Sequence, residues 1–483
     1  MSEIELKFHI PATQYSKLHH AIQEQQPKLI QLAAYYYDTP SQALSKAQLS
    51  LRQRLENKVW TQTLKAPSSH HAKRIEIEET LDEKPNGIDL KRYVKNKQAQ
   101  ALLKPVLATK QPLILQFRTE VKRLNLQMNH GDSHIEIALD QGWLIAAHQK
   151  VKISEIEFEL KKGQISDLIA CLQPWVKQYH LYLDVQSKAA RGYALLNTQP
   201  QAATYAQSFI LNQTHSAELA LKQMISSCLQ HMLPNASAIA RGNYQASHVH
   251  QLRVGIRRLR SALKSFADWT THDLSLWQQQ LKNLFQHLGS TRDYDAIVSD
   301  VLPALQHAGA PFDSLPEPKH KNHDLSQYFR EPSSSLLWLD LLNFSQHASV
   351  TDSSQDLTHL AAKQIGKLQR KITAQSDNFM QLSTEQKHQL RKQVKQLRYS
   401  LEFTHSLFKP KHVKRYLKAL KPLQEVLGEF NDLCVAEEHF KILAKKRREY
   451  WFAIGWIAAQ QQQVLSRAHV ALQHFSTHAD AGL

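Results

Sequence analysis

The chain has 483 residues, of which 42% are hydrophobic and 21% are charged, so wholesale disorder is excluded and two or three domains are expected. Its 60 Lys and Arg residues outnumber its 43 Asp and Glu residues, which gives a formal net charge of +17. Because the excess is spread over both halves of the chain, it indicates an anionic partner: nucleic acid, polyphosphate, acidic lipid or a phosphorylated small molecule.

The first part of the chain, up to about residue 193, predicts β-strands. Polar and apolar side chains alternate in the runs 3–10, 51–55, 60–65, 74–79, 113–126, 134–140 and 153–160, and turn-forming sequences separate several of them. Many strands joined by hairpin-like turns favour an antiparallel sheet or barrel, with helices expected near residues 12–25 and 165–178.

From about residue 210 the apolar residues recur three and four positions apart, which predicts long amphipathic helices. The stretch 197–206 is the expected linker, so the predicted domains are residues 1–200 and 207–483. The sequence His-Gln-Leu-Arg at 250–253 recurs at 388–391, and Leu-Gly at 288–289 recurs at 427–428. The helical half is therefore predicted to be a duplicated bundle, with repeats at about 212–300 and 355–475.

The number and spacing of the cysteines and the length of the apolar runs indicate in which cellular compartment the protein is expected. Cys171, Cys228 and Cys434 lie far apart and form no CxxC pair, so neither a disulfide framework nor a thiolate zinc site is expected. The chain opens without the pattern of a secretory signal, and its longest strongly apolar run, 451–459, is too short to cross a bilayer. We expect a cytoplasmic protein without a membrane partner.

One face of nearly every predicted strand carries charge. The alternating polar residues are Glu3, Glu5 and Lys7; Arg52 and Arg54; Thr63 and Lys65; Arg74, Glu76 and Glu78; Glu136 and Asp140; Glu155, Glu157 and Glu159. A single such strand is most simply half-buried with a solvated face. Six strands with one pattern instead favour a closed sheet with a charged lumen, which suits a metal–polyanion complex: carboxylates hold Mg²⁺ or Mn²⁺, and Lys and Arg hold phosphate oxygens.

Several ordered motifs carry a family resemblance. They are the ExExK sequence at 3–7, Tyr-Tyr-Asp-Thr-Pro at 36–40, Leu-Arg-Gln-Arg at 51–54, Thr-Leu-Lys at 63–65, 137–142, Glu-Ile-Glu-Phe-Glu-Leu at 155–160, and Ser-Lys-Ala-Ala-Arg-Gly-Tyr at 187–193. In these motifs the chain resembles the CYTH, or triphosphate tunnel metalloenzyme, superfamily. The helical half resembles the CHAD domain, and together the two resemble bacterial two-domain inorganic triphosphatases.

The resemblance implies an α+β architecture, with an eight-stranded antiparallel tunnel followed by an all-α domain. It implies hydrolysis of inorganic triphosphate with Mg²⁺ or Mn²⁺ as cofactor. The implied phosphate-binding residues are Lys7, Arg52, Arg54, Lys65, Arg123, Lys188 and Arg191, and the implied metal ligands are Glu3, Glu5, Asp140, Glu157 and Glu159. Glu76 or Glu78 would orient the attacking water, with Lys65 as a further catalytic residue.

The helical half carries two matching basic stripes. His250, Arg253, Arg257 and Arg260 step by three, four and three residues, and His388, Arg391, Lys395 and Arg398 step identically, so each set shares one helix face. A solvated basic face is the simplest interpretation of one such helix, but its duplication favours a groove for a polyanion. The resemblance to CHAD domains implies long-chain polyphosphate as the ligand.

Other functions remain open at this point. The same tunnel could act on thiamine triphosphate or a nucleoside triphosphate, or cyclise ATP, and a non-catalytic polyphosphate-binding protein is a further alternative. Nucleic-acid binding is disfavoured, because the basic stripes lack interleaved aromatic residues for base stacking. The phosphate-loop sequence GxxxxGK[ST] is absent, which excludes a P-loop ATPase.

Overall fold

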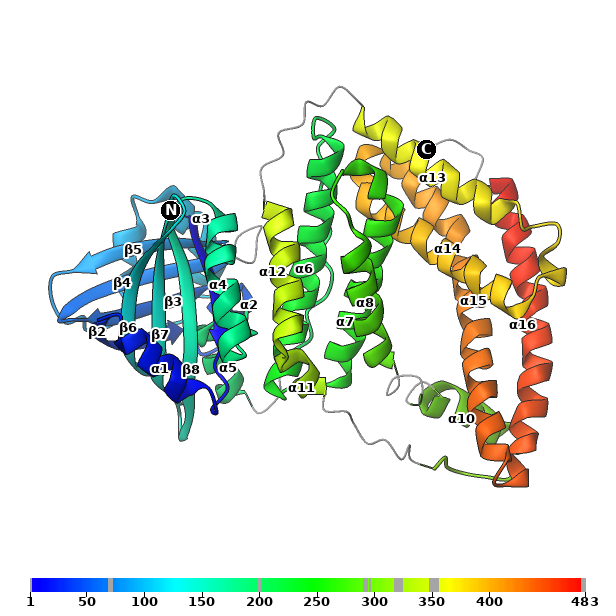
Figure 1. The fold of residues 1–483 in the computed structure, drawn as a ribbon, viewed down its shortest axis with the longest axis horizontal. Helices are drawn as coiled ribbons and strands as arrows, with labels where there is room; N and C mark the ends of the chain where they lie inside the picture. Colours follow the sequence, from blue (N-terminus) through cyan, green and yellow to red (C-terminus); the bar gives the residue numbers. More distant parts are fainter. Residues whose placement is uncertain are drawn as a thin grey trace. The chain divides into compact units, whose positions relative to one another are not determined.

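The computed structural model describes residues 2–67, 73–197, 201–289, 294, 297–316, 325–346 and 356–478. The chain divides into two compact units (Figure 1). The first unit comprises residues 1–205, 229–252 and 324–347, so it includes part of the helical half. The second comprises residues 206–228, 253–323 and 348–483.

An antiparallel sheet forms the frame of the first unit. Within the described residues its strands are β1 (Ser2–His9), β2 (Lys28–Asp38), β3 (Ser50–Glu56), β4 (Val59–Pro67), β5 (Lys73–Leu81), β6 (Ile114–His130), β7 (Ser133–Ala146), β8 (Gln149–Lys162) and β9 (Tyr182–Leu183). Their order is β5-β4-β3-β2-β6-β7-β8-β1-β9, and an additional pairing of β5 with β1 closes the sheet. The α+β class and the tunnel are confirmed, but eight strands is one too few: the ring of eight is extended by β9, a two-residue strand beside β1.

Alternation along the strands separates a charged lumen from an apolar outer face. In register, Lys65 lies opposite Glu76 on β5, and both face the lumen. Their apolar neighbours Leu51, Leu64 and Ile77 are buried on the other face. There they pack with α2 (Ala43–Lys46) and α3 (Lys97–Leu107), so burial of apolar area holds the sheet from outside.

Helices cover the sheet and close one part of its lumen. The helices α1 (Tyr15–Gln23) and α4 (Ile165–Tyr179) lie against its strands. The helix α5 (Lys188–Leu196) is different, since its Ala189 and Tyr193 pack against the inward-facing Tyr36 and Phe117. A β-carbon on Gly192 would lie 2.3 Å from the Phe117 ring, so glycine allows α5 to approach the sheet this closely.

The helical half begins with α6 (Ala217–Arg241) and α7 (Ala246–Ser265). Residues 229–252, from parts of α6 and α7, belong to the first unit, as do α11 (Leu325–Arg330) and α12 (Pro332–Gln346). In that unit, α12 packs against α4 and β9. The linker sequence contributes neither helix nor strand at 201–206.

The second unit is built from the remaining helices. They are α8 (Ser275–His287), a π-helical turn at Ile297–Val301, α10 (Leu302–His307), α13 (Leu357–Thr373), α14 (Thr384–Thr404), α15 (Pro410–Ala444) and α16 (Trp451–His478), with short 3-10 helices at Ala267–Trp269, Phe379–Gln381, His405–Leu407 and Arg448–Tyr450. The helices α15 and α16 run side by side (Figure 1). The apolar stripe Leu390, Val394, Leu397 and Leu401 of α14 is fully buried in their core. Among the described residues, no helix combines the length and apolar character needed to span a bilayer.

Candidate active site in the tunnel

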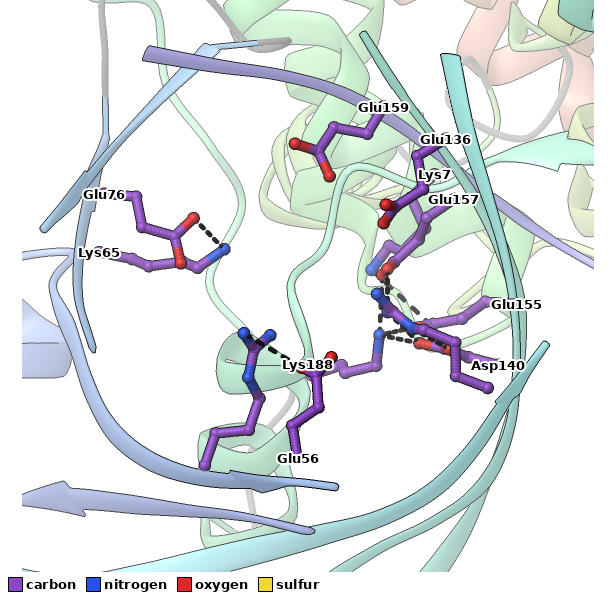
Figure 2. A network of polar contacts seen from close by, with 12 residues as sticks. Lys7, Glu56, Lys65, Glu76, Glu136, Asp140, Glu155, Glu157, Glu159 and Lys188 are labelled. Atoms are coloured by element: carbon purple, nitrogen blue, oxygen red, sulfur yellow. Dashed lines mark hydrogen bonds and ion pairs between the residues drawn. The ribbon is translucent and has the colours of Figure 1, made fainter. Parts of the chain in front are cut away.

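The lumen of the closed sheet contains a cavity of about 910 Å³. Cationic residues predicted from the sequence line it: Lys7, Arg52, Arg54, Lys65, Arg123 and Lys188. Carboxylates line it as well, namely Glu5, Glu56, Glu76, Glu78, Glu79, Glu136, Glu157, Glu159 and Asp184. Figure 2 shows the Lys65–Glu76 pair on one wall and Lys188 with its carboxylate partners on the opposite wall. The tunnel is therefore a mixed-charge container, as the alternation predicts.

Three carboxylates meet on the wall formed by β7 and β8. Asp140, Glu155 and Glu157 each offer an oxygen within 4.8 Å of the others. Lys188, at the start of α5, contacts all three, with its Nζ 2.8 Å from Asp140 Oδ2 and 2.7 Å from Glu157 Oε1. Arg123 donates to Asp140 at 2.7 and 2.8 Å and to Glu157 at 2.5 Å. The cluster is thus paired with two cations for which the family resemblance implies phosphate binding.

These ion pairs favour the charged forms of the residues in the cluster. Burial opposes ionisation of Glu157, but the charges of Lys188 and Arg123 lower its pKa to about 2. The pKa of Glu155 also lies well below its ordinary value, because Arg191, Lys188 and Lys7 outweigh its burial. Burial likewise disfavours the charged form of Lys188, yet Asp140, Glu155 and Glu157 raise its pKa well above 10.5.

The wall formed by β4 and β5, across the lumen from this cluster, brings together the residues predicted to be catalytic. Glu76 contacts Lys65 Nζ at 2.9 Å and Arg52 at 3.5 Å. Glu78, one alternation further along β5, accepts a hydrogen bond from Thr63 at 3.1 Å and lies 3.5 Å from Arg54. Burial and the neighbouring Arg52 lower the pKa of Arg54. Both candidate glutamates are therefore held next to cations, with Glu76 the more buried at 18% side-chain exposure against 38% for Glu78.

The remaining tunnel residues are placed as follows. Arg191 is outside the cavity lining and lies 2.8 Å from Glu155, so it supports the carboxylate cluster. Glu5 lies opposite Glu159 in the register of β1 and β8, and Glu159 lies opposite Glu136 on β7. The backbone of Glu3 lies in β1, but its side chain is outside the part of the chain that the structure describes.

A second cavity, of about 520 Å³, lies among helices of the second unit. Its basic lining residues are Arg253, Arg257, Arg260, Lys264, Arg391, Lys392 and Lys395. The Phe285 ring lies beneath this group, with the Arg253 guanidinium 4.4 Å from the ring centroid. Asp300 and Asp432 also line the cavity. The two basic stripes thus meet at one site.

Three residues of the predicted stripes are not among the residues that line this cavity: His250, His388 and Arg398. The cavity-facing side of α14 also includes Lys392 and Tyr399, so it is rotated by part of a turn from the predicted face. This rotation leaves Arg398 outside, where it donates to Glu402 at 2.8 Å. His250 is exposed on α7.

Two family models match the chain. That of the CYTH domain matches residues 1–193, and that of the CHAD domain matches residues 223–441. The chain carries a CYTH domain followed by a CHAD domain. The tunnel strands belong to the CYTH match and the second cavity lies within the CHAD match.

Individual relatives share parts of the chain. Inorganic triphosphatase from Haemophilus influenzae is 32% identical over 169 residues, which is 34% of this chain and 46% of that protein, so the match spans about half of the relative. The CHAD domain of the plant Ricinus communis is 28% identical with a TM-score of 0.48, covering 56% of this chain and 97% of that structure. A Hippeastrum protein with a reported dominant triphosphatase activity is 16% identical with a TM-score of 0.29, covering 40% and 95%.

The carboxylates of the CYTH domain fit a hard divalent cation. Such ions take oxygen ligands, and the charged lumen supplies carboxylates from neighbouring strands. Glu5, Glu159 and Glu136 lie side by side across β1, β8 and β7, and Lys161 pairs with Glu159 at 2.7 Å and with Glu136 at 3.8 Å, so a divalent cation bound there would share these carboxylates with that lysine. Asp140 and Glu157 belong to the three-carboxylate cluster described above.

Two residues of the CYTH tunnel were missing from the predicted site. Glu155 is 1% exposed and contacts Lys188, Arg191 and Lys7, although the family motif assigned it no role. Its alternation with Glu157 and Glu159 was the available signal. Asp184 lines the cavity from the segment after β9, and no periodicity in the sequence marks it.

Proposed function

We propose that the CYTH domain hydrolyses inorganic triphosphate to pyrophosphate and phosphate. The observation that carries this proposal is a closed lumen lined with predicted phosphate-binding cations on opposing walls, with acidic side chains between them. A triphosphate is a short, highly charged anion, and Lys and Arg side chains arranged around it can hold each phosphate group. The likeness of the chain, over 169 residues, to an inorganic triphosphatase supports the choice of substrate.

In this proposal the side chains position the reactants and neutralise charge, which supply most of the rate in phosphoryl transfer. Lys7, Arg52, Arg54, Arg123 and Lys188 hold phosphate oxygens. Water attacks a terminal phosphorus, the bridging P–O bond breaks, and pyrophosphate leaves with that electron pair.

On the wall that carries β5, Glu76 orients the water and takes its proton, while Lys65 pairs with Glu76 and faces the developing negative charge. Glu78 lies one alternation away and is the alternative base. Glu76 is favoured because it is more buried and contacts both Lys65 and Arg52.

Mg²⁺ or Mn²⁺ is the proposed cofactor. Glu5, Glu157, Glu159 and Asp140 would hold it, with Glu3 as the further ligand expected from the sequence. When bound, the ion would polarise phosphate oxygens and make bound water more acidic. Arg123 and Lys188 contact Asp140 and Glu157, so these cations must turn from carboxylate to phosphate as the site fills.

We propose that the CHAD domain, within the boundary predicted at residues 207–483, binds long-chain polyphosphate. The supporting observation is the convergence of basic side chains from α7 and α14 on the cavity of about 520 Å³. Its size accommodates a segment of the polymer, and the Arg and Lys side chains of its lining would pair with the phosphate groups.

The decisive assay offers the purified protein tripolyphosphate, thiamine triphosphate, ATP and long-chain polyphosphate, each with Mg²⁺ or Mn²⁺, and measures released phosphate. Metal-dependent release that is fastest from tripolyphosphate is expected, and chelation by EDTA should stop it. Faster turnover of thiamine triphosphate or ATP would replace the substrate, and no release from any of them would favour a binding protein. Glu5→Gln should abolish turnover while the CHAD domain stays folded.

A further inference from the structure

The tunnel cavity is partly enclosed by helices of the CHAD match. Leu233 on α6 and Leu342 on α12 line it, and both lie in the same compact unit as the strands. The end of β9 and the segment that follows it are held to these helices by backbone N–H groups: Leu183 donates to Ser335 Oγ at 3.0 Å, and Val185 donates to Ser237 Oγ at 3.1 Å. Helices outside the CYTH match thus fix a segment that borders the proposed substrate.

Asp184 lies at the centre of this segment and is 2% exposed. Its Oδ2 accepts a charge-assisted hydrogen bond from Arg241, at the end of α6. Its Oδ1 accepts from the backbone N–H of Gln186 at 3.0 Å. The carbonyl of Gln186 in turn accepts a hydrogen bond from the ammonium group of Lys7. A continuous chain of polar contacts therefore runs from Arg241 to a predicted phosphate-binding lysine.

The charges along this series of polar contacts affect how Lys7 can bind phosphate. Lys7 is 8% exposed, and burial lowers its pKa, while Glu155 at 3.9 Å and Asp184 oppose that shift. Burial disfavours the Asp184 carboxylate, but Arg241 and Lys7 hold its pKa below the ordinary value. Without Arg241, Lys7 would be the cation acting most strongly on the buried carboxylate, and the carboxylate would draw the ammonium group away from phosphate.

We propose that Arg241 is a positioning residue for substrate binding: by neutralising Asp184, it keeps the Lys7 ammonium group available to triphosphate. The chain of action passes through the carboxylate of Asp184 and the carbonyl of Gln186, and Arg241 itself touches no substrate. This inference rests on the proposed function, since it assigns Lys7 to the triphosphate. Through Arg241, the helix α6 would take part in substrate binding in the tunnel.

The test compares variants of the full-length protein. Arg241→Gln should raise KM for tripolyphosphate about tenfold, the effect of losing one charge-assisted contact, while kcat changes by less than threefold. Arg241→Lys should recover most of the affinity. The double variant Arg241→Gln, Asp184→Asn should also recover it, because no buried anion is left to capture Lys7.

Arg330→Ala is the matched control. Arg330 lies on α11, donates to the Ala240 carbonyl at 2.6 Å and lies 5.9 Å from the Tyr182 ring, but it does not contact the chain from Asp184 to Lys7. It should leave KM unchanged. If Arg330→Ala raises KM as much as Arg241→Gln does, or if the double variant binds no better than Arg241→Gln alone, the effect is general loosening and the inference is wrong.

Calorimetric titration with tripolyphosphate separates the two hypotheses. If the unmodified protein releases no phosphate, the proposed hydrolysis fails, but the same order of dissociation constants among the variants still supports the positioning role. If the unmodified protein is active and Arg241→Gln binds tripolyphosphate normally, the positioning role alone fails. Should Arg241→Gln not fold, the double variant, which leaves no buried charge unpaired, carries the test: tripolyphosphate affinity close to that of the unmodified protein supports the positioning role, and an affinity about tenfold weaker overturns it.

Discussion

Lys188→Met gives the sharpest test of the charge arrangement in the tunnel. Lys188 neutralises three carboxylates at once, and its side chain is 14% exposed. Methionine keeps much of the side-chain length and removes the charge. Asp140, Glu155 and Glu157 would then keep Arg123 and Arg191 as neighbouring cations but lose the group that touches all of them.

The expected magnitude follows from the pKa of Glu157. The ordinary value is 4.5 and the folded value is about 2, which corresponds to roughly 3 kcal/mol of folding stability, shared between Lys188 and Arg123. Because the folded pKa is lowered, this contribution is complete above pH 4.5 and is lost as pH falls toward 2. Because Lys188 also neutralises Asp140 and Glu155, Lys188→Met should lose more than its share of that figure, about 2–3 kcal/mol at pH 7, and less than half of that at pH 3.

Urea unfolding followed by tryptophan fluorescence at pH 7, 5 and 3 measures this difference. Lys65→Met is the matched control, because Lys65 contacts Glu76 at 2.9 Å on the other wall and touches no member of the three-carboxylate cluster. It should cost less and show a weaker pH dependence. A deficit for Lys188→Met that is equal at pH 7 and pH 3, or that stays below about 1 kcal/mol at pH 7, would refute the reasoning.

Two further predictions concern the proposed activities. Glu76→Gln should lower kcat about 10²–10³-fold with little change in tripolyphosphate affinity, because the amide cannot take the proton of the attacking water. Steady-state kinetics measures kcat, and calorimetry measures the affinity. An equal loss of kcat in Glu78→Gln would contradict the assignment of Glu76 as the base. Arg257→Gln with Lys395→Gln should weaken long-chain polyphosphate binding at least tenfold on the scale of two lost ionic contacts, whereas Arg398→Gln, outside the cavity, should change it little in the same binding assay.

The sequence was sufficient for the walls of the tunnel because strand alternation is a local property. Lys65 and Glu76 face the same lumen for the reason that Leu64 and Ile77 face the outer core: successive side chains on a strand point to opposite sides. Closure of the sheet followed from the cost of placing so many charges on one face. The ninth strand escaped detection, because two residues are too few to show a period.

Contacts between distant segments were beyond the reach of such patterns. Asp184 and Arg241 are 57 residues apart, and their pairing depends on how α6 packs on the segment after β9. The position of Arg398 shows the same limit. Helical spacing identifies residues that share a face, but the packing of neighbouring helices decides which part of that face borders a cavity, and Arg398 is not among the lining residues. The local sequence was enough to identify which charged residues face the lumen. The partner that each of them contacts depends on tertiary packing.

The ion pairs of the tunnel also predict how a metal should bind in the absence of substrate. In the structure the carboxylates near Lys188 are already neutralised, so a divalent cation must compete with that lysine for their oxygens. Lys188→Met removes the one competitor that contacts all three carboxylates, although Arg123 and Arg191 stay beside them, and the substrate-free variant should bind Mn²⁺ at least tenfold more tightly than the unmodified protein. Mn²⁺ at about 100 times the dissociation constant would then restore roughly 2.7 kcal/mol, close to the stability that the substitution removes. Electron paramagnetic resonance titration of free Mn²⁺, with urea unfolding in parallel, measures both effects. If Mn²⁺ stabilises the two proteins equally, the cation does not bind at the cluster of Asp140, Glu155 and Glu157, and the carboxylates near Glu5 and Glu159 become the stronger candidates.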